Sequence, residues 1–190
     1  MCGRYYIAIE EKELQDIMRE VQQKVDAYAA KMAEVKTGEI FPTNIVPVIT
    51  PNGAALMKWG FKKFDGSGQI INARSETLLE KPMFRKPLLE GQRCLVPASN
   101  YFEWQTPPEG KKIKHAIFNP SAPVIYMAGL YRLEKESDLP VFVIMTKDAA
   151  PNLCVIHNRM PVISRKEDAL AWLRDGGSSK SEAMLEYKAV

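Results

Sequence analysis

Hydrophobic residues recur every three or four positions between residues 10 and 36, which is the spacing of an amphipathic α-helix. Gly38 follows this stripe and suits the end of a helix. The pattern predicts one long helix whose apolar face packs against the core. The apolar positions of the stripe are Leu14, Ile17, Met18, Val21, Val25, Tyr28, Met32 and Val35.

Short apolar runs separated by turn residues dominate most of the remaining chain and predict β-strands. Pro51-Asn52-Gly53 is typical of a hairpin, and Pro107-Pro108-Glu109-Gly110 is typical of a turn. Successive strands joined by such turns favour antiparallel pairing. The expected strands cover residues 3–9, 46–50, 54–59, 93–96, 101–104, 113–118, 124–131 and 141–146.

Three further segments have the pattern of short helices, namely residues 75–79, 83–88 and 182–187. Ser164-Arg165-Lys166-Glu167 fits a capping box and predicts a helix through Leu173, which Gly176-Gly177 ends. Together these elements predict the α+β class, with a mostly antiparallel, barrel-like sheet flanked by helices. We expect a single domain over residues 1–190, since no segment resembles a linker.

Composition and charge narrow the classes of protein. The chain has 190 residues, of which 46% are hydrophobic and 26% charged, as in soluble globular proteins. No apolar run approaches the roughly 20 residues of a membrane helix, and no signal peptide is present. Cys2, Cys94 and Cys154 lie far apart, which argues against a disulfide framework or a zinc site and favours the cytosol. The net charge of +3 permits a nucleic-acid partner without requiring one.

Cys2 directly follows Met1 and is the most informative candidate for chemistry. Removal of Met1 would leave a thiol and an α-amine on adjacent carbons, with ordinary pKa values of about 8.5 and about 7.7–8.0. Such an aminothiol condenses with an aldehyde to a Schiff base, and the thiol then closes a thiazolidine ring. The same group could act as an N-terminal nucleophile in amide hydrolysis. An ordinary cysteine in second position is the third interpretation.

Three other polar residues are candidates for catalysis. Glu103 lies between Phe102 and Trp104, so its carboxylate either points outward or faces a pocket and transfers protons. His157 is either structural or a group for proton transfer near neutral pH. Asn72 could orient an amine or a backbone group, or cap the following helix. His115, the other histidine, is interpreted as a strand or surface residue.

Arginine and tryptophan residues near these candidates suit nucleic acid. Arginine pairs with phosphate through two hydrogen bonds, and tryptophan offers a face on which bases stack. Surface ion pairs are the alternative for the arginines, and core packing is the alternative for the tryptophans. Trp172, on the late helix, is assigned to the core. The candidates are Arg4, Arg74, Arg85, Arg159, Trp59 and Trp104.

Four segments in this order resemble the SRAP family (SOS-response-associated peptidase domain). They are Met1-Cys2-Gly3-Arg4, Asn72-Ala73-Arg74-Ser75-Glu76-Thr77, Arg93 through Trp104, and His157-Asn158-Arg159-Met160-Pro161. The resemblance is strongest over residues 2–173.

The resemblance implies a protein that binds single-stranded DNA and crosslinks covalently to abasic sites, a lyase-like chemistry that shields the lesion. It implies that Cys2 is the nucleophile and that Asn72 holds its amino end. It also implies that Glu103 assists proton transfer and that His157 helps to open the deoxyribose ring. The implied DNA contacts are Arg4, Arg74, Arg85 and Arg159 to phosphates, Trp59 and Trp104 along the cleft, and Thr146.

Two other functions remain open at this point. One is a thiol peptidase that uses Cys2 with His157 and Glu103, which the family name also suggests. The other is a non-covalent single-strand binder, for which Cys2 would be dispensable. For each, we expect no metal or organic cofactor, no membrane partner and a monomer. We expect a cytoplasmic protein, associated with the nucleoid when it acts on DNA.

Overall fold

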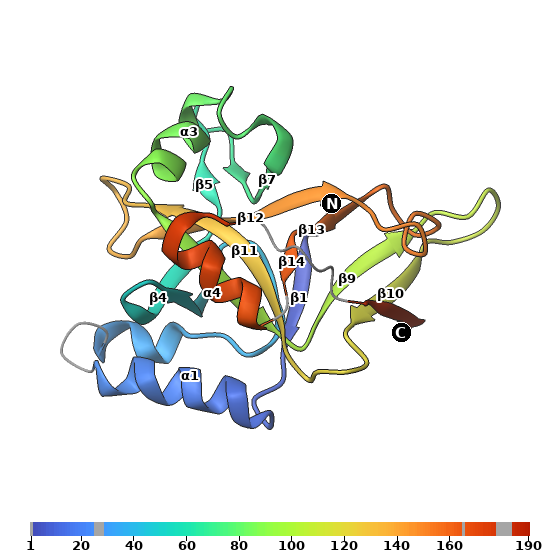
Figure 1. The fold of residues 1–190 in the computed structure, drawn as a ribbon, viewed down its shortest axis with the longest axis horizontal. Helices are drawn as coiled ribbons and strands as arrows, with labels where there is room; N and C mark the ends of the chain where they lie inside the picture. Colours follow the sequence, from blue (N-terminus) through green and yellow to red (C-terminus); the bar gives the residue numbers. More distant parts are fainter. Residues whose placement is uncertain (1, 25–28, 165, 178–183) are drawn as a thin grey trace.

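The structure, a computed structural model, describes residues 2–24, 29–164, 166–177 and 184–190, and a closed ring of strands lies at its centre (Figure 1). The strands of this larger sheet are β3 (Ile45–Thr50), β4 (Gly53–Trp59), β7 (Asn72–Arg74), β8 (Arg93–Ala98), β11 (Ile125–Arg132), β12 (Val141–Asp148), β13 (Arg159–Pro161) and β14 (Ile163–Ser164). Neighbours pair in the order β12, β4, β3, β8 and β11, and β11 pairs back with β12. This closure confirms the predicted barrel-like sheet.

A second sheet lies beside the ring and carries the start of the chain. Its strands, in spatial order, are β15 (Glu186–Ala189), β10 (Ile113–Phe118), β9 (Asn100–Gln105), β1 (Arg4–Ile7) and β2 (Gly38–Ile40). All of its pairings are antiparallel. A separate small hairpin joins β5 (Phe61–Lys62) to β6 (Gln69–Ile70).

The prediction of mostly antiparallel pairing is confirmed, and the parallel pairs between the strands named here involve β12. This strand runs parallel to β4 and to β7. The register of the second pair places Asn72 beside Ile144 and Arg74 beside Thr146. The Pro51-Asn52-Gly53 hairpin is also confirmed, since it joins β3 to β4 with Gly53 at φ +91°.

Aromatic side chains fill the space between the two sheets. Trp59 is fully buried, stacks on Phe142 with ring centroids 6.3 Å apart, and contacts Tyr5 at 5.2 Å. Its indole Nε1 donates a hydrogen bond to the Ile71 carbonyl at 3.0 Å. Trp172 is buried as predicted.

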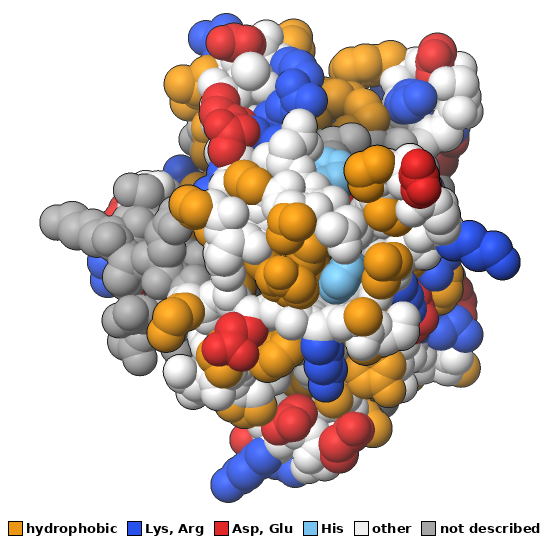
Figure 2. Space-filling view, turned by 90° about the vertical axis from the view of Figure 1, so that its right-hand side faces the viewer, with side chains coloured by type: hydrophobic (Ala, Val, Ile, Leu, Met, Phe, Trp, Pro, Cys, Tyr) orange, Lys and Arg blue, Asp and Glu red, His pale blue; other side chains and the backbone are white. Residues whose placement is uncertain are grey.

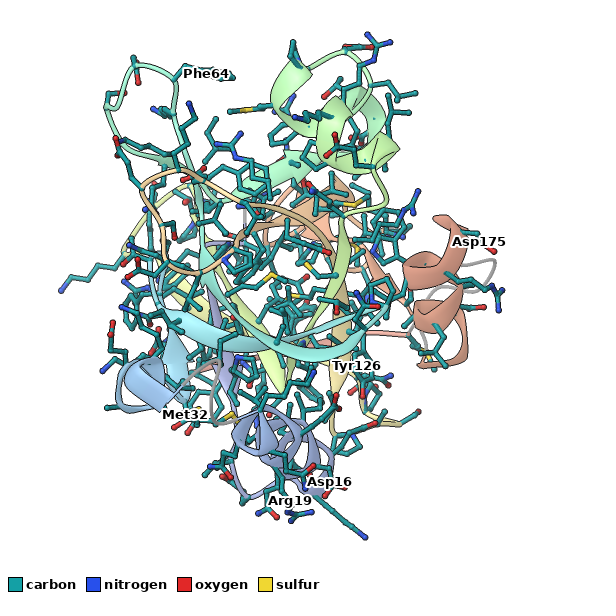
Figure 3. The ribbon with its side chains drawn as sticks, turned by 90° about the vertical axis from the view of Figure 1, so that its left-hand side faces the viewer. Asp16, Arg19, Met32, Phe64, Tyr126 and Asp175 are labelled. Atoms are coloured by element: carbon teal, nitrogen blue, oxygen red, sulfur yellow. The ribbon has the colours of Figure 1, made fainter. Side chains whose placement is uncertain are left out.

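Helices α1 (Lys12–Gln23), α3 (Pro82–Leu89) and α4 (Lys166–Asp175) cover the outside of the sheets (Figure 3). Glu20 of α1 and Lys24, the residue that follows α1, tie the helix to β4. Glu20 accepts a hydrogen bond from the Ala54 amide at 2.8 Å, and Lys24 donates to the Ala54 carbonyl at 2.6 Å. Helices α3 and α4 confirm the predicted helices at residues 83–88 and 166–173. The capping box itself includes Arg165, which lies outside the described residues.

The single helix predicted over residues 10–36 is wrong in its second half. Helix α1 ends at Gln23, residues 25–28 lie outside the described part of the chain, and Ala29–Glu34 form a 3₁₀-helix, η1. Val35 then bridges to Ile45, and the Lys36 amide donates to the Ile45 carbonyl at 2.9 Å. This pairing with β3 draws the segment out of helical geometry, although its apolar spacing continues.

Two other short predicted helices differ from the structure. Ser75–Thr77 form a single 3₁₀ turn, η2, rather than an α-helix. At the other end of the chain, Glu186 and Tyr187 belong to strand β15, which pairs with β10 through Ile117 and Tyr187. Residues 182 and 183 lie outside the described residues. The segment forms a strand rather than a helix because it pairs with the edge of β10, whose backbone groups gain hydrogen-bond partners from it.

Candidate active site

Cys2 and Asn72 meet although they are far apart in the sequence. The side-chain amide of Asn72 donates a hydrogen bond from Nδ2 to the Cys2 carbonyl oxygen at 2.8 Å. Pairing with β12 holds Asn72 at the start of β7. The following turn η2 has no side-chain cap, so Asn72 orients a backbone group rather than capping a helix.

Glu103 and Tyr101 lie on one face of β9 and share the surroundings of Cys2. Burial, and then the nearby Glu103 carboxylate, raise the pKa of the Cys2 thiol well above its ordinary value. Burial also raises the pKa of Tyr101, with Cys2 and Glu103 adding to the effect. Glu103 is only 6% exposed, so its carboxylate does not point outward into solvent.

His157 lies in the loop before β13 with its ring orientation fixed by the backbone. Its Nδ1 accepts a hydrogen bond from the Arg159 amide at 2.9 Å. In the neutral imidazole one nitrogen accepts and the other carries the proton. In the neutral ring the proton therefore lies on Nε2, and the side chain as a whole is half-buried.

The guanidinium of Arg159 joins the His157 loop to the segment that follows Asn72. It donates to Glu76 through two hydrogen bonds, at 2.6 Å and 2.9 Å, and to Asp148 at 2.5 Å. A fourth bond reaches the Thr146 carbonyl at 2.9 Å. The loop that carries His157 and the segment that follows Asn72 are thus joined through the ion pairs of Arg159.

A group of cations and aromatic rings surrounds the start of β1, and we call it the cation–aromatic cluster. Arg4 lies over the rings of Phe41 and Trp104, at 4.5 Å and 5.1 Å from their centroids. Glu39 accepts hydrogen bonds from Arg4 at 3.1 Å and from Lys114 at 2.9 Å. Figure 2 views the molecule from the side of β9 and β10 and shows hydrophobic side chains at the centre of that face with charged ones around them.

The described residues form neither a cluster of metal ligands nor a membrane-spanning helix. Within the ranges given above, no three His, Cys, Asp or Glu side chains gather as a metal ion would require. Among the helices of these same ranges, none has both the length and the apolar character needed to cross a membrane.

Comparison with known protein families identifies the family of this chain. The family model for SOS response associated peptidase (SRAP) matches residues 1–189. The chain belongs to the SRAP family. The match also extends the resemblance beyond residue 173, to strand β15 at the end of the SRAP fold.

Relatives of this SRAP protein include bacterial and vertebrate proteins. It is 32% identical to the abasic site processing protein YoqW of Bacillus subtilis over 185 residues, which cover 91% of this chain and 80% of YoqW. It is 31% identical to the abasic site processing protein HMCES of Gallus gallus over 158 residues, covering 67% of this chain and 47% of HMCES. A crystal structure of a Bacteroides thetaiotaomicron protein is similar to this structure, with a TM-score of 0.78 and 25% sequence identity. The match covers the whole of this chain and 92% of that protein's chain.

The predicted DNA contacts fall into two groups in this SRAP structure. Arg74 and Arg85 are exposed, while Arg4 and Trp104 are half-buried in the cation–aromatic cluster. The others are buried: Trp59 and Thr146 are 0% exposed, and Arg159 is 9% exposed. Trp59 and Thr146 therefore offer no surface to DNA in this structure, and for Trp59 the alternative of core packing is the correct one.

Sequence reasoning missed two aromatic residues. Tyr101 lies with Cys2 and Glu103, and the alternation of β9 was the signal that could have placed it there. Phe64 is 85% exposed in the loop between β5 and β6, where Asp65-Gly66-Ser67-Gly68 marks a turn. An exposed aromatic ring ahead of a glycine-rich turn was the signal for a surface contact.

Proposed function

We propose that this SRAP protein processes abasic sites in single-stranded DNA by bonding Cys2 covalently to the aldehyde of the lesion. The observation that carries the proposal is the hydrogen bond from Asn72 to the Cys2 carbonyl, which holds this residue beside Glu103. A residue at the end of a chain is a poor nucleophile unless it is held in place, because orientation accounts for much of a catalyst's effect. Relatives named abasic site processing proteins support the same chemistry.

The first step needs a free α-amine on Cys2. Met1 is bonded to that nitrogen, so removal of Met1 frees the amine and takes away one neighbour of Cys2. The amine adds to the aldehyde carbon, and loss of one water gives a Schiff base. Asn72 would direct the amine in this step by holding the adjacent carbonyl.

His157 is suited to making the aldehyde available. An abasic deoxyribose must open its ring before the aldehyde exists, and opening requires a proton on the ring oxygen as the hydroxyl proton leaves. His157 carries its proton on Nε2, so it can donate to that oxygen.

The thiol then converts the Schiff base to a stable ring. The sulfur adds to the iminium carbon, the C=N electron pair returns to nitrogen, and the thiol proton passes to a base. The raised pKa of Cys2 means that the thiol keeps its proton until a base removes it, and the Glu103 carboxylate is adjacent. Ring closure removes the iminium that would drive elimination of the 3′ phosphate, so the strand stays intact.

DNA would be held by its backbone and by stacking, without sequence preference. Arg74 and Arg85 are exposed cations for phosphates, and Arg4 with Trp104 lies at the start of β1 beside Cys2. We add Phe64 to this surface as a ring on which a base stacks. Trp59 and Thr146 are left out because both are buried.

A thiol peptidase is less well supported by the geometry. Such an enzyme gains reactivity from a lowered thiol pKa, whereas burial and Glu103 raise the pKa of Cys2. The α-amine also separates the two functions, because a peptidase that works through the thiol and a histidine does not need it.

The test compares two proteins that differ by one residue ahead of Cys2. One begins at Cys2, and the other carries a single glycine before it, which leaves the thiol intact and moves the amine away. Each is mixed with single-stranded DNA containing one abasic site and run on a denaturing gel. We expect a heat-stable adduct from the first protein alone, and equal adducts from both would overturn the proposal.

A further inference from the structure

His115 is a buried histidine beside the proposed reaction site. It lies in strand β10, as predicted, but it is only 6% exposed and is therefore not a surface residue. The ring of Tyr187 in β15 packs edge-on against the imidazole, with ring centroids 5.4 Å apart. A polar ring is costly to bury unless its nitrogens find partners, so the surroundings of both nitrogens matter.

The register of β9 and β10 pairs His115 directly with Glu103. Residues paired in this way project from the same face of a sheet, with Cβ atoms about 4.5–5.5 Å apart. Glu103 is equally buried, and its charge contributes to the raised pKa of the Cys2 thiol. This face of the sheet therefore places the imidazole next to the carboxylate, and the carboxylate near the thiol.

The two nitrogens of the His115 ring differ in their surroundings. Nε2 lies 3.1 Å from the side-chain oxygen of Gln105, which can only accept a hydrogen bond, so Nε2 carries the proton in the neutral ring. Nδ1 is buried and has no hydrogen-bond partner among the residues that the structure describes. Because Nδ1 is bonded to Cγ, it lies near the base of the side chain, where Glu103 is the cross-strand neighbour. The neutral ring thus keeps a nitrogen that can accept a proton close to Glu103.

Removal of the thiol proton needs an acceptor of this kind. A carboxylate alone is a poor acceptor for a thiol proton, because carboxyl groups are much stronger acids than thiols. An imidazole binds protons near neutral pH, so passing the proton on to it makes the transfer more favourable. As the sulfur adds to the iminium carbon, the thiol proton moves to Glu103 and a proton leaves Glu103 for Nδ1. The thiol loses one proton, the imidazole gains one, and Glu103 ends as a carboxylate.

We propose that His115 acts through Glu103 by accepting the proton that Glu103 takes from the Cys2 thiol. The inference rests on the proposed function of abasic-site crosslinking. It predicts that His115 assists closure of the thiazolidine ring and has no part in forming the Schiff base that precedes it.

Single-turnover reactions on abasic single-stranded DNA separate the two steps, because borohydride traps the Schiff base and heating reveals the closed ring. His115→Gln keeps an amide that can reach Gln105 but cannot take up a proton. We expect it to form the Schiff base at the wild-type rate and to convert it to the heat-stable adduct about tenfold more slowly, a smaller loss than that of a direct general base. His115→Asn, a shorter side chain that also cannot take up a proton, should behave in the same way. Conversion at the wild-type rate in these folded variants would overturn the proposal.

Tyr187→Leu is the matched control for packing. It removes the ring that packs against His115 and leaves the imidazole in place. We expect this variant to convert the Schiff base at the wild-type rate. Equal slowing in Tyr187→Leu and His115→Gln would overturn the proposal, because lost packing would then account for both.

The pH profile of conversion is a readout that packing does not change. The strands paired with β10 are β9 and β15, and the titratable residues that they carry on the face of His115 are Tyr101, Glu103 and Tyr187, with Cys2 near Glu103. Histidine is the side chain that ordinarily titrates between pH 5 and 8. An imidazole that is already protonated at the acid end cannot accept a further proton, so wild-type conversion should rise with pH. We expect His115→Gln to lose this part of the rise, and a profile like that of the wild type would contradict the relay.

Glu103→Gln tests whether His115 acts through this carboxylate. If it does, adding His115→Gln to Glu103→Gln slows conversion no further, since residues that act as a unit are not additive. A further loss of about tenfold in the double variant, with thermal unfolding confirming that it folds, would refute the relay. Absence of any adduct from the wild type would instead refute the proposed function, and the relay with it.

Discussion

Asn72 is the single residue whose side chain most directly fixes the reactive end of the chain. We expect Asn72→Ala to slow crosslinking by up to about tenfold, because one hydrogen bond contributes about 1 kcal/mol. Single-turnover kinetics on abasic single-stranded DNA measures this rate. Asn72→Asp keeps the shape but cannot donate to the Cys2 carbonyl, so a wild-type rate for this variant would contradict the role.

In the proposed mechanism, the thiol of Cys2 decides whether the abasic strand is protected or cleaved. With Cys2→Ser, we expect the amine to form a Schiff base that borohydride traps, but no heat-stable adduct, because the hydroxyl does not close the ring in place of the thiol. A denaturing gel with and without borohydride measures both products. An adduct from Cys2→Ser as heat-stable as that of the wild type would contradict the mechanism.

The sequence suggests a chemistry for these residues but does not reveal their surroundings. The aminothiol of Cys2 follows from its position in the sequence alone. For Glu103, the sequence left open to which of the two faces of its strand the side chain points. Which face is buried depends on the elements that pack over β9, and these come from distant parts of the chain. The same dependence on distant partners explains why Trp59 and Thr146 were mistaken for surface residues.

At the scale of elements, the loop between β5 and β6 presents an exposed aromatic ring, Phe64, whereas Trp59 is buried in the core. We expect Phe64→Ala to weaken binding of single-stranded DNA by about tenfold, since stacking contributes about 1–3 kcal/mol per base. Its unfolding temperature should not change, because the ring is 85% exposed. Fluorescence anisotropy and calorimetry measure the two effects.

Trp59→Ala is the contrasting variant. Its ring is buried against Tyr5 and Phe142, so we expect the free energy of unfolding to fall by about 3–5 kcal/mol. Urea unfolding measures this loss. Wild-type stability in Trp59→Ala, or wild-type DNA affinity in Phe64→Ala, would contradict our assignment of these two rings.

The bridge between η2 and β13 should make stability depend on acid. The pKa of Glu76 is lowered from 4.5 to about 2 by the hydrogen bond from Arg159. A lowered pKa means that the stabilisation is complete above about pH 4.5 and is lost as the pH falls towards 2. We expect urea unfolding to show this loss in the wild type and a smaller one in Glu76→Gln. Equal losses in the two proteins would exclude the ion pair as the cause.

Sequence patterns predicted helices and turns correctly where contacts between residues close in the sequence determine the structure. The hairpin at Pro51-Asn52-Gly53 and helix α3 agree with their sequence patterns. The segment after Gln23 and the tail at Glu186 differ because each pairs with a distant strand, β3 or β10. Pairing of this kind depends on three-dimensional proximity, which helical spacing does not reveal.

Across the whole molecule, the fold brings Cys2, Asn72 and Glu103 together from the start of the chain, β7 and β9. His157 lies in the loop before β13, a strand that pairs with the same strand β12 as β7 does. Strand β12 supports two of these segments by pairing with both β7 and β13. The barrel could be predicted from its strands, but the meeting of these segments could not, since it depends on closure of the ring.

Intact-mass spectrometry of the covalent product tests the central claim most directly. Protein beginning at Cys2 is incubated with single-stranded DNA bearing one abasic site, beside Cys2→Ala under the same conditions. The account predicts a species with the mass of protein plus DNA less one water, heat-stable and missing from Cys2→Ala. Absence of this species, when the spectrum also confirms a free Cys2 amine, would contradict the account.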